Sequence, residues 1–149
     1  MSDLDELELR AWQALLHAHQ QVTRVLDGEL RTEHGLSLGD YDVLLRLSRA
    51  PDRSLKMTEL ARRVMMSPSG LTRAADRLVA SGLIRRERIE DDARVMLVRL
   101  TDEGRGVLRA AARTHLRGIR EHFTGLLGPG QLRAVASALE RVTGPHEPH

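Results

Sequence analysis

Hydrophobic residues recur at helical spacing along most of the chain. From Leu4 to about His34 they occupy more than one face of a single long helix, so this helix should be covered on several sides. A second helix is expected after Ser37, because Ser37 and Asp40 have the spacing of a capping box and Pro51 ends the apolar pattern. These two helices precede a more polar middle segment.

The C-terminal third predicts two more helices. Thr101 caps the first of them. We expect this helix to continue to Leu127, because Gly128 and Pro129 then break the pattern. The stretch QLRAVASALERV predicts a last amphipathic helix, and the tail 145–149 is expected to be disordered. The first and last helices carry more apolar surface than one small domain can bury, which favours a homodimer.

A short helix, a turn and another short helix occupy the middle of the chain. MTELARRVM predicts the first helix, although Lys56 at the cap position cannot accept a hydrogen bond. Ser67 caps the second helix and Pro68 takes its first position. This second helix is expected to run to about Ser81, because Gly82 supplies the C-terminal cap.

Two β-compatible runs, LIRRERI and RVMLVRL, follow this helix, and the polar stretch IEDDA between them predicts a hairpin tip. Helix, turn, helix and hairpin together form a winged helix-turn-helix. The predicted fold is therefore mainly α with a small β-hairpin wing. Residues 36–101 form the expected DNA-binding lobe, and residues 1–35 and 102–144 form the N- and C-terminal helical dimerisation region.

The distribution of charge along the chain says more about function than the net charge does. The 149 residues have a net charge of only +2, whereas residues 53–99 contain 11 Lys and Arg against six Asp and Glu. The absence of cysteine excludes thiol catalysis and disulfides. No apolar run approaches the roughly 18 residues of a membrane span, so we expect a cytoplasmic protein without membrane contact.

The helix after Ser67 has the surface that a major groove requires. Bulky residues in its first turn would hold a recognition helix away from the base edges. The candidate DNA-binding residues are small or polar and avoid the apolar face: Ser67, Ser69, Gly70, Thr72, Arg73 and Arg77. The two arginines are candidate readers of guanine. The alternative interpretation is an ordinary solvated helix face.

The basic hairpin beside this helix favours DNA binding. Arg94, near the hairpin tip, is a candidate for contact with the narrow minor groove. Asp92 can hold the Arg94 guanidinium in position, or form an exposed ion pair of little energetic value.

These features together resemble the MarR family of winged-helix transcriptional regulators. The resemblance rests on MTELARRVMMSPSGLTRAADRLVASGLIRR, on DDAR followed by VMLVRLTDEG, and on the flanking helices. The family's wing usually reads Asp-Arg-Arg. Here Ala93 replaces the first arginine, while Arg94, which reaches the minor groove in the family, is present.

The resemblance implies a homodimer held by the first helix and the last two helices. It implies binding to a pseudo-palindromic DNA operator, with two recognition helices in successive major grooves. It also implies a repressor that is released by a small aromatic or lipophilic effector lodged between the dimerisation helices and the DNA-binding lobe. No cofactor is expected.

Trp12 and His115 are the candidate ligand-binding residues. In some members of the family a tryptophan on the first helix lines a ligand pocket, including in urate-responsive members. Packing in the core or the dimer interface is the alternative for Trp12. His115 lies on an apolar helix face, where it can meet a carboxylate ligand or be an ordinary half-buried histidine.

Three other functions are weighed against this one. A DNA-binding architectural protein without ligand control would have the same basic surface. For a metal-responsive regulator, chelation within one helix is not expected, because His17 and His19 point to different sides and His115 and His122 are two turns apart; no metal site is assigned. An enzyme is not expected, because the chain lacks a Gly-rich phosphate loop, G-x-S-x-G and H-E-x-x-H.

Overall fold

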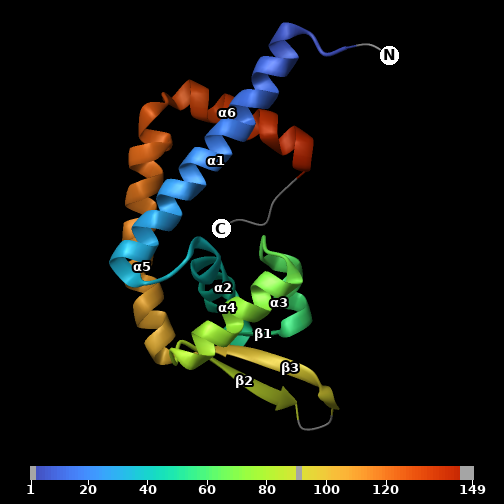
Figure 1. Ribbon diagram of the computed structural model, residues 1–149, viewed down its shortest axis with the longest axis vertical. Coiled ribbons are helices and arrows are strands. Elements are labelled where there is room, and N and C mark those ends of the chain that lie inside the picture. The colour runs from blue at the N-terminus through green and yellow to red at the C-terminus, as the bar shows by residue number, and fades with distance from the viewer. Residues whose placement is uncertain (1–2, 90–91, 145–149) are drawn as a thin grey trace.

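The computed structural model describes residues 3–89 and 92–144. Long helices form one end of the molecule and a small lobe with a wing forms the other (Figure 1). In chain order the elements are α1 (Glu6–His34), α2 (Leu38–Arg49), η1 (Pro51–Arg53), β1 (Ser54–Lys56), α3 (Met57–Arg63), α4 (Pro68–Ala80), β2 (Ile84–Ile89), β3 (Asp92–Leu100), α5 (Asp102–His122), η2 (Thr124–Leu126) and α6 (Pro129–Thr143). The predicted mainly helical fold with a small β wing is confirmed.

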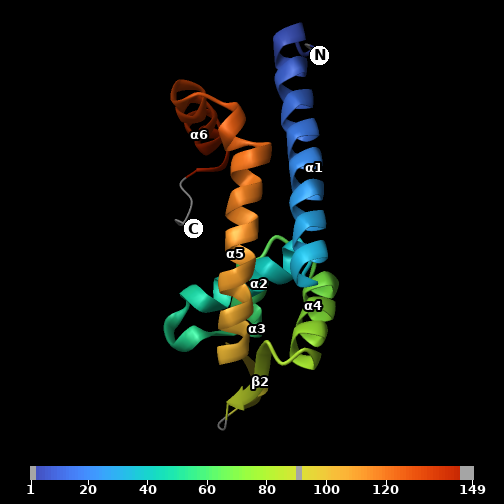
Figure 2. The same cartoon turned by 90° about the vertical axis from the view of Figure 1, so that its left-hand side faces the viewer.

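None of the helices among the described residues combines the length and hydrophobicity that crossing a bilayer requires. The longest, α1, has 29 residues and begins at a capping box that joins Asp5 and Glu8. It runs beside α5 over much of its length (Figure 2). Only its C-terminal part is covered, where Leu26 and Leu30 are buried, whereas residues 3–21 are all exposed.

The hydrophobic core is built around the apolar face of α2. The predicted capping box is confirmed: the Asp40 backbone N–H donates to Ser37 Oγ at 2.9 Å, and the Ser37 N–H donates to Asp40 Oδ2 at 3.0 Å. This box fixes the start of α2, whose apolar face is inaccessible to solvent. The core combines this face with side chains from α1, α3, α4, α5 and the sheet, among them Leu30, Val43, Leu44, Leu47, Leu60, Leu71, Leu78, Ile84, Val98 and Leu100.

The wing belongs to a three-stranded antiparallel sheet in the order β1-β3-β2, rather than to an isolated hairpin. In β1, Leu55 is buried and pairs with Val98 of β3. The sequence pattern did not predict this strand, because three residues are too few to show alternation. Lys56 gives α3 no side-chain cap, as expected, and its backbone instead pairs with Leu97.

The prediction that the fifth helix reaches Leu127 was wrong. The α5 helix ends at His122, because the backbone of Phe123 leaves helical geometry at φ −139° and ψ −76° and a short η2 turn follows. Gly125 then approaches the Arg120 carbonyl so closely that a Cβ would overlap it. The apolar residues here fit either a continued helix or a turn, so periodicity alone could not locate the end.

One small joint connects the wing lobe to α5. Thr101 caps α5 by accepting the Gly104 N–H at 3.0 Å, and its hydroxyl donates to the Gly82 carbonyl at 2.7 Å. Gly82 has a positive φ of 77°, as the predicted C-terminal cap of α4 requires. A Cβ at Gly104 would overlap the Leu83 carbonyl, so only glycine allows this close approach.

Candidate nucleic-acid interface

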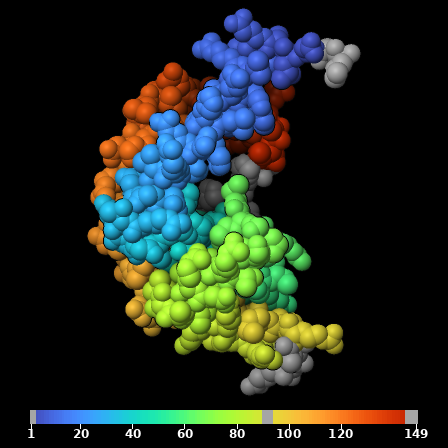
Figure 3. All heavy atoms as spheres, viewed as in Figure 1, coloured from blue at the N-terminus to red at the C-terminus, as the bar shows by residue number. Residues whose placement is uncertain are grey.

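The α4 helix presents one apolar and one polar face. Leu71, Ala74, Ala75 and Leu78 are buried against the core. Ser67 caps the helix by accepting the Gly70 N–H at 3.1 Å. The helix ends at Ala80, one residue before its predicted end near Ser81. Together with the wing, α4 lies at the end of the molecule opposite the N-terminus of α1 (Figure 3).

The first two turns of α4 expose small and polar side chains. Ser67, Ser69, Thr72 and Arg73 are exposed, and Gly70 is partly covered. The Thr72 hydroxyl donates to the Pro68 carbonyl at 3.0 Å, within its own helix. Among residues 3–89 and 92–144, Arg73 has no hydrogen bond or ion pair, so its guanidinium is available to an outside acceptor.

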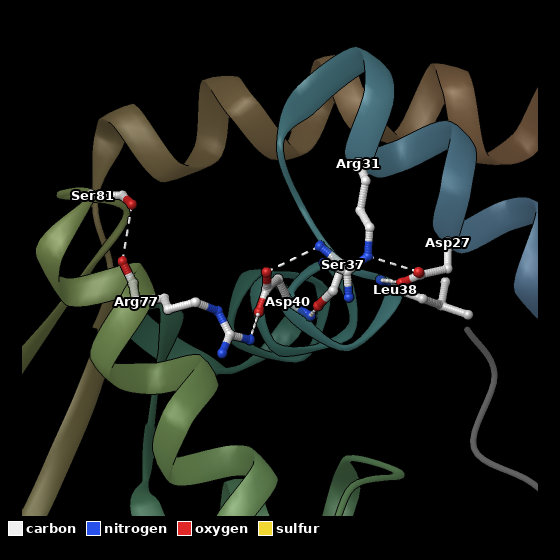
Figure 4. A network of polar contacts seen from close by, with 7 residues as sticks. All are labelled: Asp27, Arg31, Ser37, Leu38, Asp40, Arg77 and Ser81. Carbon is white, nitrogen blue, oxygen red and sulfur yellow. Dashed lines mark hydrogen bonds and ion pairs between the residues drawn. The ribbon is translucent and has the colours of Figure 1, made fainter.

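Arg77, one turn further along α4, is held differently. Its guanidinium donates to Asp40 Oδ1 at 2.8 Å, and the Asp40 side chain is only 7% exposed. The same carboxylate caps α2, so Asp40 joins α2 to α4 (Figure 4). Arg77 is therefore anchored to the protein and still 56% exposed.

The polar network of Figure 4 continues from α2 to α1. The Leu38 N–H donates to Asp27 Oδ1 at 2.8 Å, and Arg31 Nε donates to Asp27 Oδ2 at 2.7 Å. Burial acts to raise the pKa of Asp27, but these hydrogen bonds outweigh it and the pKa lies below its ordinary value. A hollow of about 360 Å³ beside the network is lined by residues that include Arg31, Asp40 and Arg77.

The wing strands also anchor their basic side chains. Arg86 of β2 pairs with Asp76 of α4 at 2.6 Å, which joins the wing to α4. Arg99 of β3 donates to the Asp52 carbonyl at 2.8 Å. Arg94 is exposed on β3 near the tip of the wing. The proposed partnership of Asp92 with Arg94 lies outside the described residues, because the Asp92 side chain is not among them.

The two candidate ligand-binding residues are not brought together within one protomer. The Trp12 side chain is 53% exposed on the uncovered half of α1. His115 packs on Tyr41 of α2, with ring centroids 4.6 Å apart and the rings tilted by 45°. Leu26 of α1 lies beside Gly118, which is one turn of α5 from His115. Because the 14 residues from Trp12 to Leu26 span about 21 Å of helix, Trp12 lies far from His115.

The environment of His115 is unusual. Burial lowers its pKa, and the nearby Glu29 carboxylate opposes this shift only in part. Among the described residues its Nδ1 atom is buried without a hydrogen-bond partner. The Tyr41 hydroxyl beside it has a pKa raised by burial.

The sequence did not reveal the acids that position the basic side chains. Asp40 was predicted only as part of a capping box, and no role was predicted for Asp76. Their partners Arg77 and Arg86 come from other elements. No sequence spacing predicts such pairs, because the packing of α2, α4 and β2 sets their distances.

Comparisons with known proteins place this geometry in one group. A family model described as MarR family matches residues 34–95. The HTH-type transcriptional regulator PecS of Dickeya dadantii is 30% identical over 121 residues, which cover 80% of this chain and 72% of that protein. The HTH-type transcriptional repressor YetL of Bacillus subtilis is 28% identical over 107 residues, covering 72% of this chain and 64% of that protein.

The structural match extends over nearly the whole chain. Sco3205, a MarR family transcriptional regulator from Streptomyces coelicolor solved in complex with DNA, superimposes with a TM-score of 0.89 at 31% identity. The match covers 99% of this chain and 93% of Sco3205. With its wing, its exposed α4 face and these relatives, the chain belongs to the MarR family of DNA-binding transcriptional regulators.

Proposed function

We propose that this chain is a ligand-responsive repressor that binds a pseudo-palindromic operator as a homodimer and is released by a small aromatic or lipophilic effector. The observation that carries the proposal is the exposed stripe of Ser69 and Arg73 on α4, next to a wing that carries Arg94. Asp40 and Asp76 anchor the neighbouring basic side chains Arg77 and Arg86. Arg73 is left to an outside partner.

On the operator, α4 enters the major groove. Ser67, Ser69 and Gly70 let the helix tip approach the base edges. Arg73 then reads guanine, a bidentate contact worth about 1–3 kcal/mol of discrimination, while Thr72 and the anchored Arg77 contact the operator beside it. In the wing, Arg94 contacts the minor groove and Asp92 positions its guanidinium.

The homodimer is supported by apolar surface that one protomer leaves uncovered. Leu7, Trp12 and Leu16 are exposed on the outer half of α1, and Leu139 and Val142 are exposed on α6. The two helices lie at the same end of the molecule (Figure 1). A second copy can cover both, and would place two α4 helices about 34–36 Å apart, one turn of DNA.

Ligand response is supported by the connection between the two parts of the protomer. Asp27 of α1 accepts the Leu38 N–H, and Asp40, two residues further along α2, accepts the Arg77 guanidinium of α4, so the first turn of α2 is bonded to both helices. A ligand that binds one spacing of these helices better than the other shifts the protein toward that spacing. The hollow beside these bonds is lined by Arg31 and Arg77, each paired with a carboxylate whose place a ligand anion would have to share.

Trp12 and His115 take separate roles in this proposal. The unpartnered Nδ1 atom of His115 can pair with a ligand carboxylate that enters beside Tyr41. Trp12 would have to reach the ligand from the partner subunit or pack in the dimer interface, because it lies far along α1 from His115.

The experiment is a fluorescence anisotropy titration of a duplex from the protein's own promoter, repeated with a panel of aromatic acids. We expect saturable binding that weakens with rising salt, and a loss of affinity with at least one acid. Specific binding that no ligand changes would favour an architectural protein. Binding that does not distinguish the promoter from random DNA would contradict the proposed function.

A further inference from the structure

A cluster of two carboxylates and one imidazole lies where α1 packs against the end of α5. Glu29 comes from α1, and Glu121 and His122 come from the last turn of α5. One ligand atom from each of these residues lies within 4.8 Å of the other two. Glu29 and His122 are half-buried, and Glu121 is exposed.

One oxygen in this cluster is buried and lies within ion-pair distance of His122 but makes no hydrogen bond among the described residues. Glu29 Oε1 has no exposed surface and, among the described residues, accepts no hydrogen bond. His122 Nε2 is 3.2 Å away, but the ring is not aligned to donate to it. A buried carboxylate oxygen without a donor is unfavourable unless a cation or a donor satisfies it.

The α5 backbone makes room for this oxygen. A Cβ at Gly118 would lie 2.6 Å from Glu29 Oε1 and 2.7 Å from a methyl group of Leu26. Glycine at this position therefore lets the carboxylate lie directly against α5, one turn before His122. This packing holds Glu29 Oε1 against α5, 3.2 Å from His122 Nε2.

We propose that Glu29, Glu121 and His122 bind one first-row divalent cation, of the class of Zn²⁺, which joins α1 to α5 within a protomer. One imidazole nitrogen and two carboxylate oxygens form a donor set that Zn²⁺ accepts, with a water in the fourth position. Donor atoms around a tetrahedral Zn²⁺ are about 3.4 Å apart, so the side chains need to close by only a small amount. Mg²⁺ prefers oxygen ligands alone and fits this set less well.

This inference does not depend on the proposed function. Metal binding can be measured on the protein alone, without DNA. The cation would tie the long dimerisation helix to the helix that leads into the wing lobe. A ligand that binds only the folded state raises the unfolding temperature as its concentration increases. We therefore expect Zn²⁺ to raise the Tm of the wild-type protein, and a chelator to reverse the effect.

The test titrates the full-length chain with Zn²⁺ in competition with a chromophoric chelator. His146→Gln and His149→Gln are present in every variant, so that the histidines of the tail cannot supply the binding. We expect one Zn²⁺ per protomer. Glu29→Gln and His122→Gln should weaken binding by more than the roughly 10- to 100-fold loss that follows removal of an outer-shell partner.

Matched variants separate the site from general effects. His17→Gln removes an exposed histidine of the same α1 helix and should bind Zn²⁺ like the parent. Glu121→Gln changes an exposed side chain, so it should lower the affinity without unfolding the protein. Circular dichroism of each variant without metal checks that the fold is retained.

The site would be wrong if Glu121→Gln and His122→Gln bound Zn²⁺ as tightly as the chain that carries only His146→Gln and His149→Gln. It would also be wrong if that chain bound no Zn²⁺ at one equivalent. Displacement of Zn²⁺ by an equal concentration of Mg²⁺ would overturn the role of the imidazole. Operator binding is measured on the same chelator-treated samples. If it persists while Zn²⁺ binding fails, the metal site is wrong and the proposed function stands.

Discussion

The Arg77 guanidinium on α4 lies 2.8 Å from the Asp40 carboxylate on α2, although the two residues are 37 positions apart in the chain. Asp40 also accepts the Ser37 N–H and caps α2. One nearly buried carboxylate therefore sets the start of one helix and the position of another. The pair therefore ties α4 to the first turn of α2.

We expect Asp40→Ala to destabilise the fold by about 1–3 kcal/mol, because it removes a helix cap and a charged hydrogen-bond acceptor. Arg77→Gln should cost less, about 1 kcal/mol, because the guanidinium is largely solvated. Urea unfolding of both variants and of the double variant checks the pair. Strictly additive losses would mean that Asp40 and Arg77 do not act together.

Arg73 of α4 and Arg94 of the wing should respond differently to substitution, because the proposed function gives them different contacts with DNA. Arg73→Ala is expected to relax base preference at one position of each half-site, because it removes the proposed contact with guanine. Arg94→Ala should weaken binding to all sequences and lower the salt slope by about one. Anisotropy titrations on the promoter duplex and on single-base variants, at several salt concentrations, measure both effects. Binding unchanged in both variants would remove these assignments.

Leu139→Asp should disrupt the dimer and reduce operator binding with it, because it places a charge on the exposed apolar side of α6. Sedimentation velocity over a range of concentrations measures the change. Met65→Asp introduces the same charge at the exposed turn before α4, away from α6, and serves as the control for sedimentation. A variant at Leu139 that sediments like wild type would exclude α6 from the interface.

Gly104 and Gly106 of α5 form a matched pair for the joint between the wing and α5. A Cβ at position 104 would overlap the Leu83 carbonyl, whereas none of the described atoms lies within 4 Å of a Cβ at position 106. Gly104→Ala should therefore destabilise by about 1–3 kcal/mol or more through overpacking. Gly106→Ala should stabilise by roughly 0.5–1 kcal/mol. Urea unfolding measures the free energy of unfolding of both variants, provided that the m-value is unchanged. Similar changes in the two variants would show that the joint tolerates a side chain at position 104.

Stability should depend on pH through His115. Burial lowers its pKa below 6.5 in the folded state, so the unfolded state binds more protons at this residue between the folded pKa and 6.5. The free energy of unfolding should rise with pH across this window and lose this contribution as the pH falls through it. His115→Phe keeps a ring against Tyr41 and should flatten that part of the curve, measured by urea unfolding from about pH 5 to 8. An unchanged slope would assign the dependence to other groups, and the exposed His17→Gln is the control.

Local chemistry made much of the fold predictable from the sequence. The capping pattern at Ser37, the proline at position 68 and the glycine at position 82 are short-range signals, and each is found where it was expected. The exposed polar stripe of α4 follows in the same way, because helical periodicity fixes which side chains share a face.

The three-residue strand β1 and the end of α5 at His122 depended on contacts that carry no such periodic signal. Four acids or histidines, Asp40, Asp76, Glu29 and His122, acquired their partners only when elements distant in the chain packed together. The sequence by itself determined most helix boundaries, the wing and the exposed polar face of α4, because these rest on interactions between near neighbours. Tertiary structure alone decided which charges are anchored and which remain available, because that depends on distances that packing sets.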